Sequence, residues 1–276
     1  MNLLSETTIK KLLNEHDIRA DKHQGQNFLT SEFALKKILE AADLKEKDHV
    51  LEVGAGLGVI TKALASKVKQ VTTVERDTRL IKILEETCDL KNVKIINKDF
   101  LELDLSSFNN YKVVSSLPFN AATAIIRKIL EESSPALMAV TVQQEVAEKI
   151  TAEPPQMTLV AVAIQFYSNP KIVNNISKQE FFPQPKVNSS ILKITDILPA
   201  DHELRKREQD FFKVVKAGFA HSRKKLINSL ELQLNPNKQK IKQTLKQSNI
   251  DPGRRAETLS IEEWIRLSKN FSKLFS

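Results

Sequence analysis

The segment that decides the fold is His49-Val-Leu-Glu-Val-Gly-Ala-Gly-Leu-Gly58, which is followed by Val59-Ile-Thr-Lys-Ala-Leu-Ala65. The residues before the first glycine are mostly apolar, which predicts a short buried strand. The glycines at positions 54, 56 and 58 allow a tight turn, and the apolar spacing after them predicts a helix. A strand, a glycine-rich turn and a helix in this order are typical of the first unit of an α/β sheet that approaches a ligand closely.

Strands and helices alternate along the chain as far as residue 143. Such alternation produces a parallel sheet that helices cover on both faces, which is an α/β fold. The predicted strands cover 49–54, 70–74, 93–97, 113–114 and 136–143, and the predicted helices cover 33–42, 59–65, 77–88 and 122–131.

The second half of the chain predicts a different organisation. Further strands are predicted over 158–167 and 187–195, which gives a mostly parallel, Rossmann-like sheet of seven strands. After Pro199 the pattern is helical to the end of the chain. We therefore expect a sheet domain of residues 1–198 and a small all-helical domain of residues 199–276. The helices of that domain are predicted over 204–220, 222–233, 237–248 and 261–272.

The composition excludes several classes of protein. The chain has 276 residues, of which 41% are hydrophobic, and no stretch approaches the roughly 20 apolar residues of a membrane span. The first ten residues lack the basic and then apolar layout of a signal peptide, so we expect a cytoplasmic protein without membrane contact. Cys88 is the single cysteine, and the five histidines have no metal-ligand spacing, so neither a disulfide nor a metal site is expected.

The positive charge of the chain is concentrated in its last quarter. Residues 1–200 carry 25 Lys and Arg against 25 Asp and Glu, whereas residues 201–276 carry 17 against nine. The whole formal net charge of +8 therefore belongs to the C-terminal segment. This asymmetry indicates either a polyanion partner or a well-solvated helical surface.

Carboxylates follow two of the predicted strands in the first domain. Glu75 comes directly after the second strand, and Asp99 comes directly after the third. The carboxyl ends of parallel strands meet at one edge of a sheet, where a carboxylate can accept hydrogen bonds from ribose hydroxyls. Asp99 is placed to reach the adenine amino group. Together with the glycine loop, these residues predict a site for an adenosine-containing cofactor.

Two cofactor classes contain adenosine and fit this site, nicotinamide dinucleotides and S-adenosylmethionine. The glycine spacing is G-x-G-x-G, and dinucleotide sites have G-x-G-x-x-G. Tyr167 and Lys171 have the Y-x-x-x-K spacing of a dehydrogenase pair. That chemistry needs both residues on one helix, and Pro170 between them disfavours a helix. The residues therefore favour S-adenosylmethionine.

The fourth strand runs into Ser116-Leu117-Pro118-Phe119. Proline has no N–H to donate, so the ladder of the strand ends there. A side-chain oxygen and a backbone carbonyl whose direction proline fixes can accept hydrogen bonds from an exocyclic amino group. The adjacent phenylalanine can stack on a base that has left its helix. Beside an adenosine site, we interpret this segment as a clamp for a flipped purine rather than as a turn with a core phenylalanine.

Seven segments carry a resemblance to a known family, and they extend over nearly the whole chain. They are 25–29 (GQNFL), 52–61 (EVGAGLGVIT), 74–77 (VERD), 98–101 (KDFL), 182–189 (FPQPKVNS), 223–230 (RKKLINSL) and 255–260 (RAETLS). Together they resemble the rRNA adenine N6-dimethyltransferases of the small-subunit type. These enzymes dimethylate two adjacent adenines near the 3′ end of the small ribosomal RNA.

The resemblance implies a fold, an activity and a set of site residues. It implies a Rossmann-like methyltransferase sheet and S-adenosylmethionine as cofactor, bound by Asn27, Leu29, Gly54, Glu75, Asp99 and Ser116. It implies that Ser116, Leu117, Pro118 and Phe119 are the catalytic segment, with Phe119 stacked on the target adenine. It further implies that the C-terminal helices bind the rRNA of an immature small subunit as part of ribosome biogenesis, as a monomer. The RNA-binding residues would be Arg223, Lys224, Lys225, Arg254 and Arg255.

The chain departs from the family pattern at the clamp. Ser116 stands where the family has the asparagine of N-[LI]-P-[YF], and its oxygen does not reach as far as an asparagine amide. Asn188 replaces an aspartate, and Ser31 stands where many relatives have another. Three hypotheses therefore remain: an active small-subunit enzyme, a ribosome-assembly factor of the same fold that methylates slowly or not at all, and a large-subunit rRNA adenine methyltransferase.

Overall fold

The computed structural model describes residues 1–20, 26–88, 90–234 and 237–275, with side chains as far as residue 272. It divides into two compact units. The first contains residues 1–147 and 168–197, and the second contains residues 148–167 and 198–276. In the described part of the chain, no helix combines the length and the apolar character that a bilayer span requires. The described residues also contain no cluster of three or more His, Cys, Asp and Glu suited to a metal ion.

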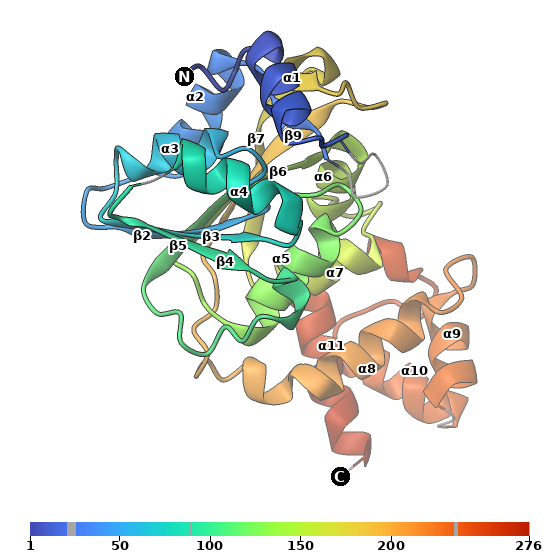
Figure 1. Ribbon diagram of the computed structural model, residues 1–276. Helices are drawn as coiled ribbons and strands as arrows, with labels where there is room; N and C mark the ends of the chain where they lie inside the picture. The colour runs from blue at the N-terminus through green and yellow to red at the C-terminus, as the bar shows by residue number, and fades with distance from the viewer. Residues whose placement is uncertain (21–25, 89, 235–236, 276) are drawn as a thin grey trace. The chain divides into compact units, whose positions relative to one another are not determined.

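The first unit is built on a mixed sheet of seven strands (Figure 1). Its order is β4 (Val93–Asn97), β3 (Gln70–Glu75), β2 (His49–Val53), β5 (Tyr111–Ser116), β6 (Leu137–Gln143), β9 (Ser189–Thr195) and β7 (Asn169–Ile176). The first five strands are parallel, and β9 runs antiparallel to both β6 and β7. The predicted seven-stranded, mostly parallel α/β sheet is thus confirmed.

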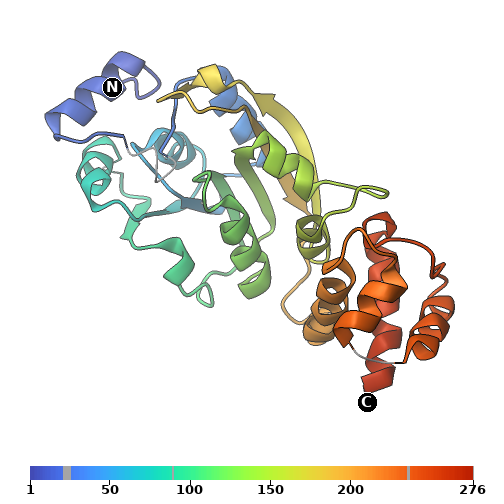
Figure 2. The same ribbon diagram turned by 90° about the vertical axis from the view of Figure 1, so that its right-hand side faces the viewer.

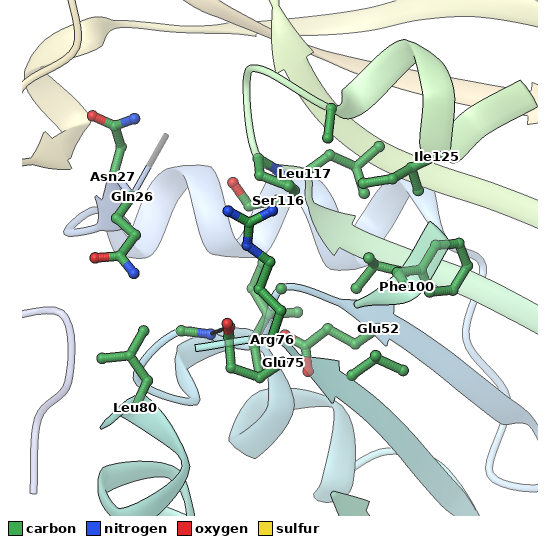
Figure 3. Close-up of a pocket in the computed structure, with 18 of the residues that line it drawn as sticks. Gln26, Asn27, Glu52, Glu75, Arg76, Leu80, Phe100, Ser116, Leu117 and Ile125 are labelled. Atoms are coloured by element: carbon green, nitrogen blue, oxygen red, sulfur yellow. Dashed lines mark hydrogen bonds between the residues drawn. The ribbon is translucent and has the colours of Figure 1, made fainter. Parts of the chain in front are cut away.

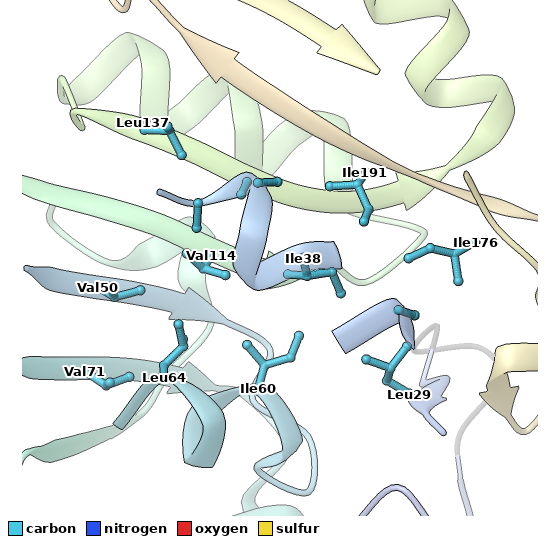
Figure 4. Close-up of a cluster of buried hydrophobic side chains, with 14 of the residues drawn as sticks. Leu29, Ile38, Val50, Ile60, Leu64, Val71, Val114, Leu137, Ile176 and Ile191 are labelled. Atoms are coloured by element: carbon cyan, nitrogen blue, oxygen red, sulfur yellow. The ribbon is translucent and has the colours of Figure 1, made fainter. Parts of the chain in front are cut away.

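The helices of the first unit complete its core. They are α1 (Glu6–Glu15), α2 (Glu32–Ala41), α3 (Val59–Ala65), α4 (Thr78–Thr87) and α5 (Ala122–Glu132), and α6 (Gln144–Ile150) begins in this unit. One cluster of buried side chains joins α2 and α3 to the sheet, with Ile38, Leu64 and Val114 fully buried in it (Figure 4). Since apolar burial is the main favourable term in folding, this cluster holds the glycine loop that opens α3 in place.

A short two-stranded sheet attaches the N-terminal segment to the first unit. Strand β1 (Phe28–Leu29) pairs antiparallel with β8 (Phe181–Phe182), so that Leu29 lies opposite Phe181. Next to this ladder, the Thr30 N–H donates to the Glu180 carbonyl over 2.9 Å. These bonds fix the N-terminal segment to a strand that is far from it in sequence.

The second unit is a bundle of helices, drawn mainly in orange and red in Figure 2. It contains α7 (Leu159–Gln165), α8 (Glu208–Phe219), α9 (Leu226–Leu234), α10 (Lys238–Gln247) and α11 (Ile261–Phe275). Trp264 and Phe211 are fully buried in it. A side chain at Gly218 would collide with the Trp264 ring, so the close packing of α8 and α11 requires a glycine there.

One predicted strand is wrong. Residues 158–167 contain helix α7, which Thr158 caps by accepting the Ala161 N–H over 2.9 Å. Four successive residues of α7 are buried. The apolar residues therefore show neither the spacing of an amphipathic helix nor the alternation of a half-buried strand, and the pattern cannot distinguish the two. The seventh strand is instead β7, at the edge of the sheet. An edge strand has a neighbour on one side only, so it tolerates Pro170, which has no backbone N–H to donate.

The same segment changes the predicted division of the chain. In the structure, residues 148–167 pack with the helical unit rather than with the sheet unit of residues 1–147 and 168–197. Phe166 stacks on Phe211 of α8 with ring centroids 4.1 Å apart, and the Tyr167 carbonyl accepts the Leu198 N–H over 2.8 Å. Helices α1 and α6 were also not predicted.

Candidate active site

A pocket lies at the carboxyl edge of the parallel strands of the first unit (Figure 3). Its walls come from the N-terminal segment, the glycine loop, the ends of β3 and β4, and the segment after β5. The predicted cofactor and catalytic residues all line it, namely Asn27, Leu29, Gly54, Glu75, Asp99, Ser116, Leu117, Pro118 and Phe119. Gly25 of the first family segment lies outside the described residues.

The glycine loop has the backbone conformation that its composition predicts. Gly54, Gly56 and Gly58 have φ values of 80°, 58° and 88°, in the left-handed region that other residues rarely adopt. The Gly54 N–H donates to the Val74 carbonyl of β3 over 2.7 Å. A Cβ at Gly54 would lie 3.6 Å from Pro118, which shows how closely the loop and the clamp approach each other.

The Glu75 carboxylate is almost enclosed at the end of β3, with 7% of the residue exposed. Its Oε2 accepts the Gly56 N–H over 3.0 Å, and its Oε1 accepts the Asp77 N–H over 2.8 Å. Burial raises the pKa of this carboxyl, and the two backbone N–H groups oppose that shift. A carboxylate has about four lone-pair sites, so two bound N–H groups leave capacity for the hydroxyls of a ribose.

Asp99 lies after β4 and is only partly buried. Its Oδ1 accepts the Leu101 N–H over 2.9 Å and caps the 3-10 helix Phe100–Glu102. Its Oδ2 lies 3.6 Å from Nη1 of Arg76. Figure 3 shows the Arg76 side chain extending from the end of the strand that carries Glu75 into the pocket. Arg76 is not among the residues predicted from the sequence.

A third carboxyl in the pocket wall, that of Glu52, was not predicted from the sequence. It lies within β2 and is 1% exposed. The Thr61 hydroxyl donates to its Oε2 over 2.5 Å. Burial raises the pKa of Glu52 to about 7. The available signal was a glutamate inside an otherwise apolar strand, since such residues are almost never buried without a partner.

The clamp segment leaves the sheet as its sequence predicts. The Leu117 N–H still bonds to the Thr141 carbonyl of β6 over 3.0 Å, and Pro118 then ends the ladder. The Pro118 carbonyl accepts the Ala121 N–H over 3.0 Å, which forms the turn into α5. The Phe119 ring meets Phe181 edge-on, with centroids 6.4 Å apart, and remains partly exposed to the pocket.

The two residues of the N-terminal segment differ in exposure. Asn27 is half-buried at the pocket wall, whereas Leu29 is 4% exposed and belongs to the hydrophobic cluster beneath the sheet. Leu117 is likewise buried. Any contact of Leu29 or Leu117 with a ligand therefore involves mainly the backbone.

The five predicted RNA-binding residues lie in the second unit but have different surroundings. Arg223, Lys224 and Lys225 are exposed on the connection between α8 and α9. Arg255 is also exposed, with its Nη1 3.8 Å from Oε1 of Glu257.

Arg254 is engaged within the unit, with 30% of its side chain exposed. Its Nη1 and Nη2 lie 2.5 and 3.0 Å from the two carboxylate oxygens of Glu263. It also donates to Thr258.

The pocket fits an adenosine cofactor by the chemistry of its lining. A buried carboxylate at the end of one strand and a second carboxylate at the end of the next suit the ribose and the adenine amino group. Apolar walls that include Leu57, Phe100 and Ile125 suit the purine ring, as in most small-molecule sites. The predicted clamp, Ser116 to Phe119, lines the same pocket.

Comparisons with known proteins agree with this geometry. The family model described as ribosomal RNA adenine dimethylase matches residues 18–273. A protein of Dehalococcoides mccartyi named ribosomal RNA small subunit methyltransferase A is 41% identical and covers 92% of this chain and 89% of its own. A protein of the same name from Alkaliphilus oremlandii is 38% identical and covers 96% of each chain.

Solved structures share the fold. The 23S rRNA methyltransferase ErmE superposes with a TM-score of 0.72 and 26% identity, over 89% of this chain and all of that one. A dimethyladenosine transferase from Plasmodium falciparum has a TM-score of 0.75 and 22% identity, over 89% and 98%. The chain therefore belongs to the ribosomal RNA adenine dimethylase family and is a methyltransferase that uses S-adenosylmethionine.

Proposed function

We propose that this protein dimethylates the N6 amino groups of two adjacent adenines near the 3′ end of small-subunit rRNA. The observation that carries the proposal is the single pocket in which Glu75 and Asp99 face the same space as Ser116 to Phe119. One set of groups suits adenosine of the cofactor, and the other suits an adenine of the substrate. Transfer requires both to be held within one enclosed site.

We assign the following binding roles to the residues of the pocket. S-adenosylmethionine supplies the methyl group when it is bound. Glu75 accepts hydrogen bonds from the ribose hydroxyls, and Asp99 accepts one from the adenine amino group of the cofactor. At the other end, Phe119 stacks on the target base.

The amino group of the target base would be held by Ser116 and a backbone carbonyl. The Ser116 hydroxyl accepts one of its hydrogen bonds. The Leu117 carbonyl is the better candidate for the second, because the Pro118 carbonyl already accepts the Ala121 N–H. Two such acceptors direct the nitrogen lone pair toward the methyl group.

The names of the relatives support the small-subunit substrate. The proteins at 38–41% identity are named for the small subunit, whereas the large-subunit enzyme ErmE is 26% identical. An rRNA substrate also suits the C-terminal segment, in which Lys and Arg outnumber Asp and Glu by 17 to nine. We extend the proposal to an immature small subunit as the form recognised, with the protein acting as a cytoplasmic monomer.

A second candidate function rests on Ser116. With a side chain shorter than asparagine at the clamp, the protein could bind rRNA and S-adenosylmethionine yet methylate slowly or not at all. It would then serve as a ribosome-assembly factor.

Primer extension on small-subunit rRNA separates the two candidates. Dimethylated adenines block the polymerase, so the enzyme predicts a block in the parent strain that disappears on deletion of the gene and returns on complementation. An assembly factor predicts the same extension products in all three strains, with immature small subunits accumulating only in the deletion strain. A block that survives the deletion would contradict the proposed activity.

A further inference from the structure

A side chain of the N-terminal segment is bonded to the strand end that carries Glu75. The Nε2 of Gln26 donates to Oδ2 of Asp77 over 2.7 Å, although the two residues are 51 positions apart. Gln26 lines the pocket and is only half-buried, whereas Asp77 is buried beneath it. This is therefore a long-range contact at the mouth of the pocket.

Asp77 occupies the centre of a small network. Its Oδ1 caps α4 by accepting the Arg79 N–H over 3.1 Å, and the Arg79 guanidinium donates to both oxygens over 2.9 and 2.7 Å. Its own backbone N–H donates to Glu75 Oε1. Through Asp77, the side chain of Gln26 and the carboxylate of Glu75 are attached to one residue.

The segment after Gln26 is also attached at the β1–β8 ladder. Phe28 and Leu29 pair with Phe182 and Phe181, and the Phe28 ring would lie 3.3 Å from a Cβ on Gly56. Asn27 lies between the ladder and Gln26, at the pocket wall. The bond at Gln26 and the ladder at residues 28–29 lie on either side of Asn27, so both help to keep it in place, and loss of either attachment gives this segment more freedom to move.

We propose that Gln26 is a positioning residue for the methyl donor, which holds residues 27–29 against the pocket through its bond to Asp77. The proposal rests on the assignment of this pocket to S-adenosylmethionine. The bond couples the N-terminal wall to the Glu75 strand end, so both sides of the ribose subsite are set before the cofactor arrives. Preorganisation of this kind lowers the ordering cost of binding.

Four variants test this tether. Gln26→Ala removes the donor, and Gln26→Glu places a second carboxylate against Asp77. Gln26→Glu combined with Asp77→Asn restores an amide–carboxylate pair with donor and acceptor exchanged, and the Arg79 guanidinium remains beside it. Gln179→Glu, on an exposed side chain of the 3-10 helix Lys178–Glu180, is the control for the added charge.

The first readout is the affinity for S-adenosylmethionine by calorimetry. Gln26→Ala and Gln26→Glu are expected to weaken it about tenfold or more, because a hydrogen bond to a charged group is lost. The exchanged pair should recover most of the affinity, and Gln179→Glu should match the wild type. Equal affinity in the wild type and Gln26→Ala, or no recovery in the exchanged pair, would overturn the proposal.

The second readout does not use the cofactor. Amide hydrogen exchange of residues 27–30 in the free protein should become faster in Gln26→Ala and Gln26→Glu, with the unfolding temperature little changed. Unchanged exchange there overturns the tether even if the cofactor binds as expected. A wild type that binds no S-adenosylmethionine, with faster exchange in the variants, would instead refute the cofactor assignment and with it the positioning role.

Discussion

Gly56 and Glu75 meet at the carboxyl edge of the sheet, where the Gly56 N–H donates to Oε2 of Glu75 over 3.0 Å. Gly56 adopts a left-handed conformation, and Glu75 is almost completely buried. The bond joins the turn after β2 to the end of β3, so the glycine turn and the carboxylate hold each other in position. The carboxylate is thus held in a fixed position in the pocket wall before any ligand binds.

Glu75→Gln should weaken the binding of S-adenosylmethionine. The amide preserves the size of the side chain but removes the charge, and a charge-assisted hydrogen bond contributes about 1.5–3 kcal/mol. The expected loss of affinity is roughly tenfold to a hundredfold, measured by calorimetry. Glu102→Gln, on an exposed side chain of the neighbouring 3-10 helix, is the control. Equal affinity in Glu75→Gln and the wild type would remove Glu75 from the ribose role.

Ser116→Asn should accelerate methyl transfer. A longer acceptor holds the target amino group more rigidly in line with the reacting bond, and one positioned hydrogen bond is worth about 1–3 kcal/mol, or roughly tenfold to a hundredfold in rate. The measurement is single-turnover transfer of labelled methyl groups to unmethylated small subunits. Affinity for S-adenosylmethionine should change far less.

A slower Ser116→Asn variant would show instead that the site is adapted to serine. A wild type already as fast as relatives with asparagine would equally contradict an impaired clamp. No transfer from either version would favour the assembly-factor function.

Neutralising Arg223, Lys224 and Lys225 should reduce the salt dependence of RNA binding. Each lost phosphate contact lowers the slope of log K against log salt by about 0.7–0.9. Binding of a small-subunit rRNA fragment measured over a range of salt concentrations gives this slope. An unchanged slope would indicate that a different surface binds the RNA, for example the one that carries Lys10, Lys11 and Arg19.

Arg254→Gln is the matched control for this surface. Its guanidinium is held by Glu263 inside the helical unit, so its loss leaves a half-buried carboxylate without its partner. We expect a lower unfolding temperature and a nearly unchanged salt slope. A reduced slope without loss of stability would instead support the predicted RNA-binding role of Arg254.

The buried carboxyl of Glu52 should make the stability of the first unit depend on pH. Burial raises its pKa to about 7, from an ordinary value of 4.5. Between these two values the folded protein retains a proton that the unfolded chain has lost, so the free energy of unfolding falls as pH rises. The fall amounts to at most about 3 kcal/mol and ends above pH 7 or so.

Glu52→Gln should flatten this dependence, because the amide does not titrate. Urea unfolding at several pH values between 5 and 8 measures the effect, and the difference between variant and wild type isolates Glu52 from Glu75, whose pKa is raised as well. Glu102→Gln should retain the wild-type dependence. Parallel curves for the wild type and Glu52→Gln would contradict a raised pKa at this position.

The sequence predicted the features that local patterns control. Alternating strands and helices, the glycine turn and the stop at Pro118 each follow from the chemistry of adjacent residues, and the structure contains them at the expected positions. The strand prediction for residues 158–167 was wrong because a fully buried helix and a fully buried strand are equally apolar. In the structure, Phe166 of this segment stacks on Phe211, and a contact with such a distant part of the chain leaves no local pattern in the sequence.

Two of the missed site residues, Gln26 and Arg76, have a partner far away in sequence. Gln26 gains its role from Asp77, and Arg76 lies beside Asp99 only because β3 and β4 are neighbours in the sheet. The RNA-binding role of Arg254 stays a prediction, but the sequence did not predict that Glu263 holds its guanidinium through a bidentate contact. A local sequence pattern gives the type of each residue but does not predict which distant residue it will contact.

The most direct test of the central claim is mass spectrometry of the 3′ fragment of small-subunit rRNA after incubation of unmethylated small subunits with the purified protein and S-adenosylmethionine. The account predicts two adjacent adenines that each carry two methyl groups, and no modification when Glu75→Gln and Phe119→Ala are combined. An unmodified fragment would contradict the proposed activity. Methylation confined to large-subunit rRNA in a parallel incubation would contradict the proposed substrate.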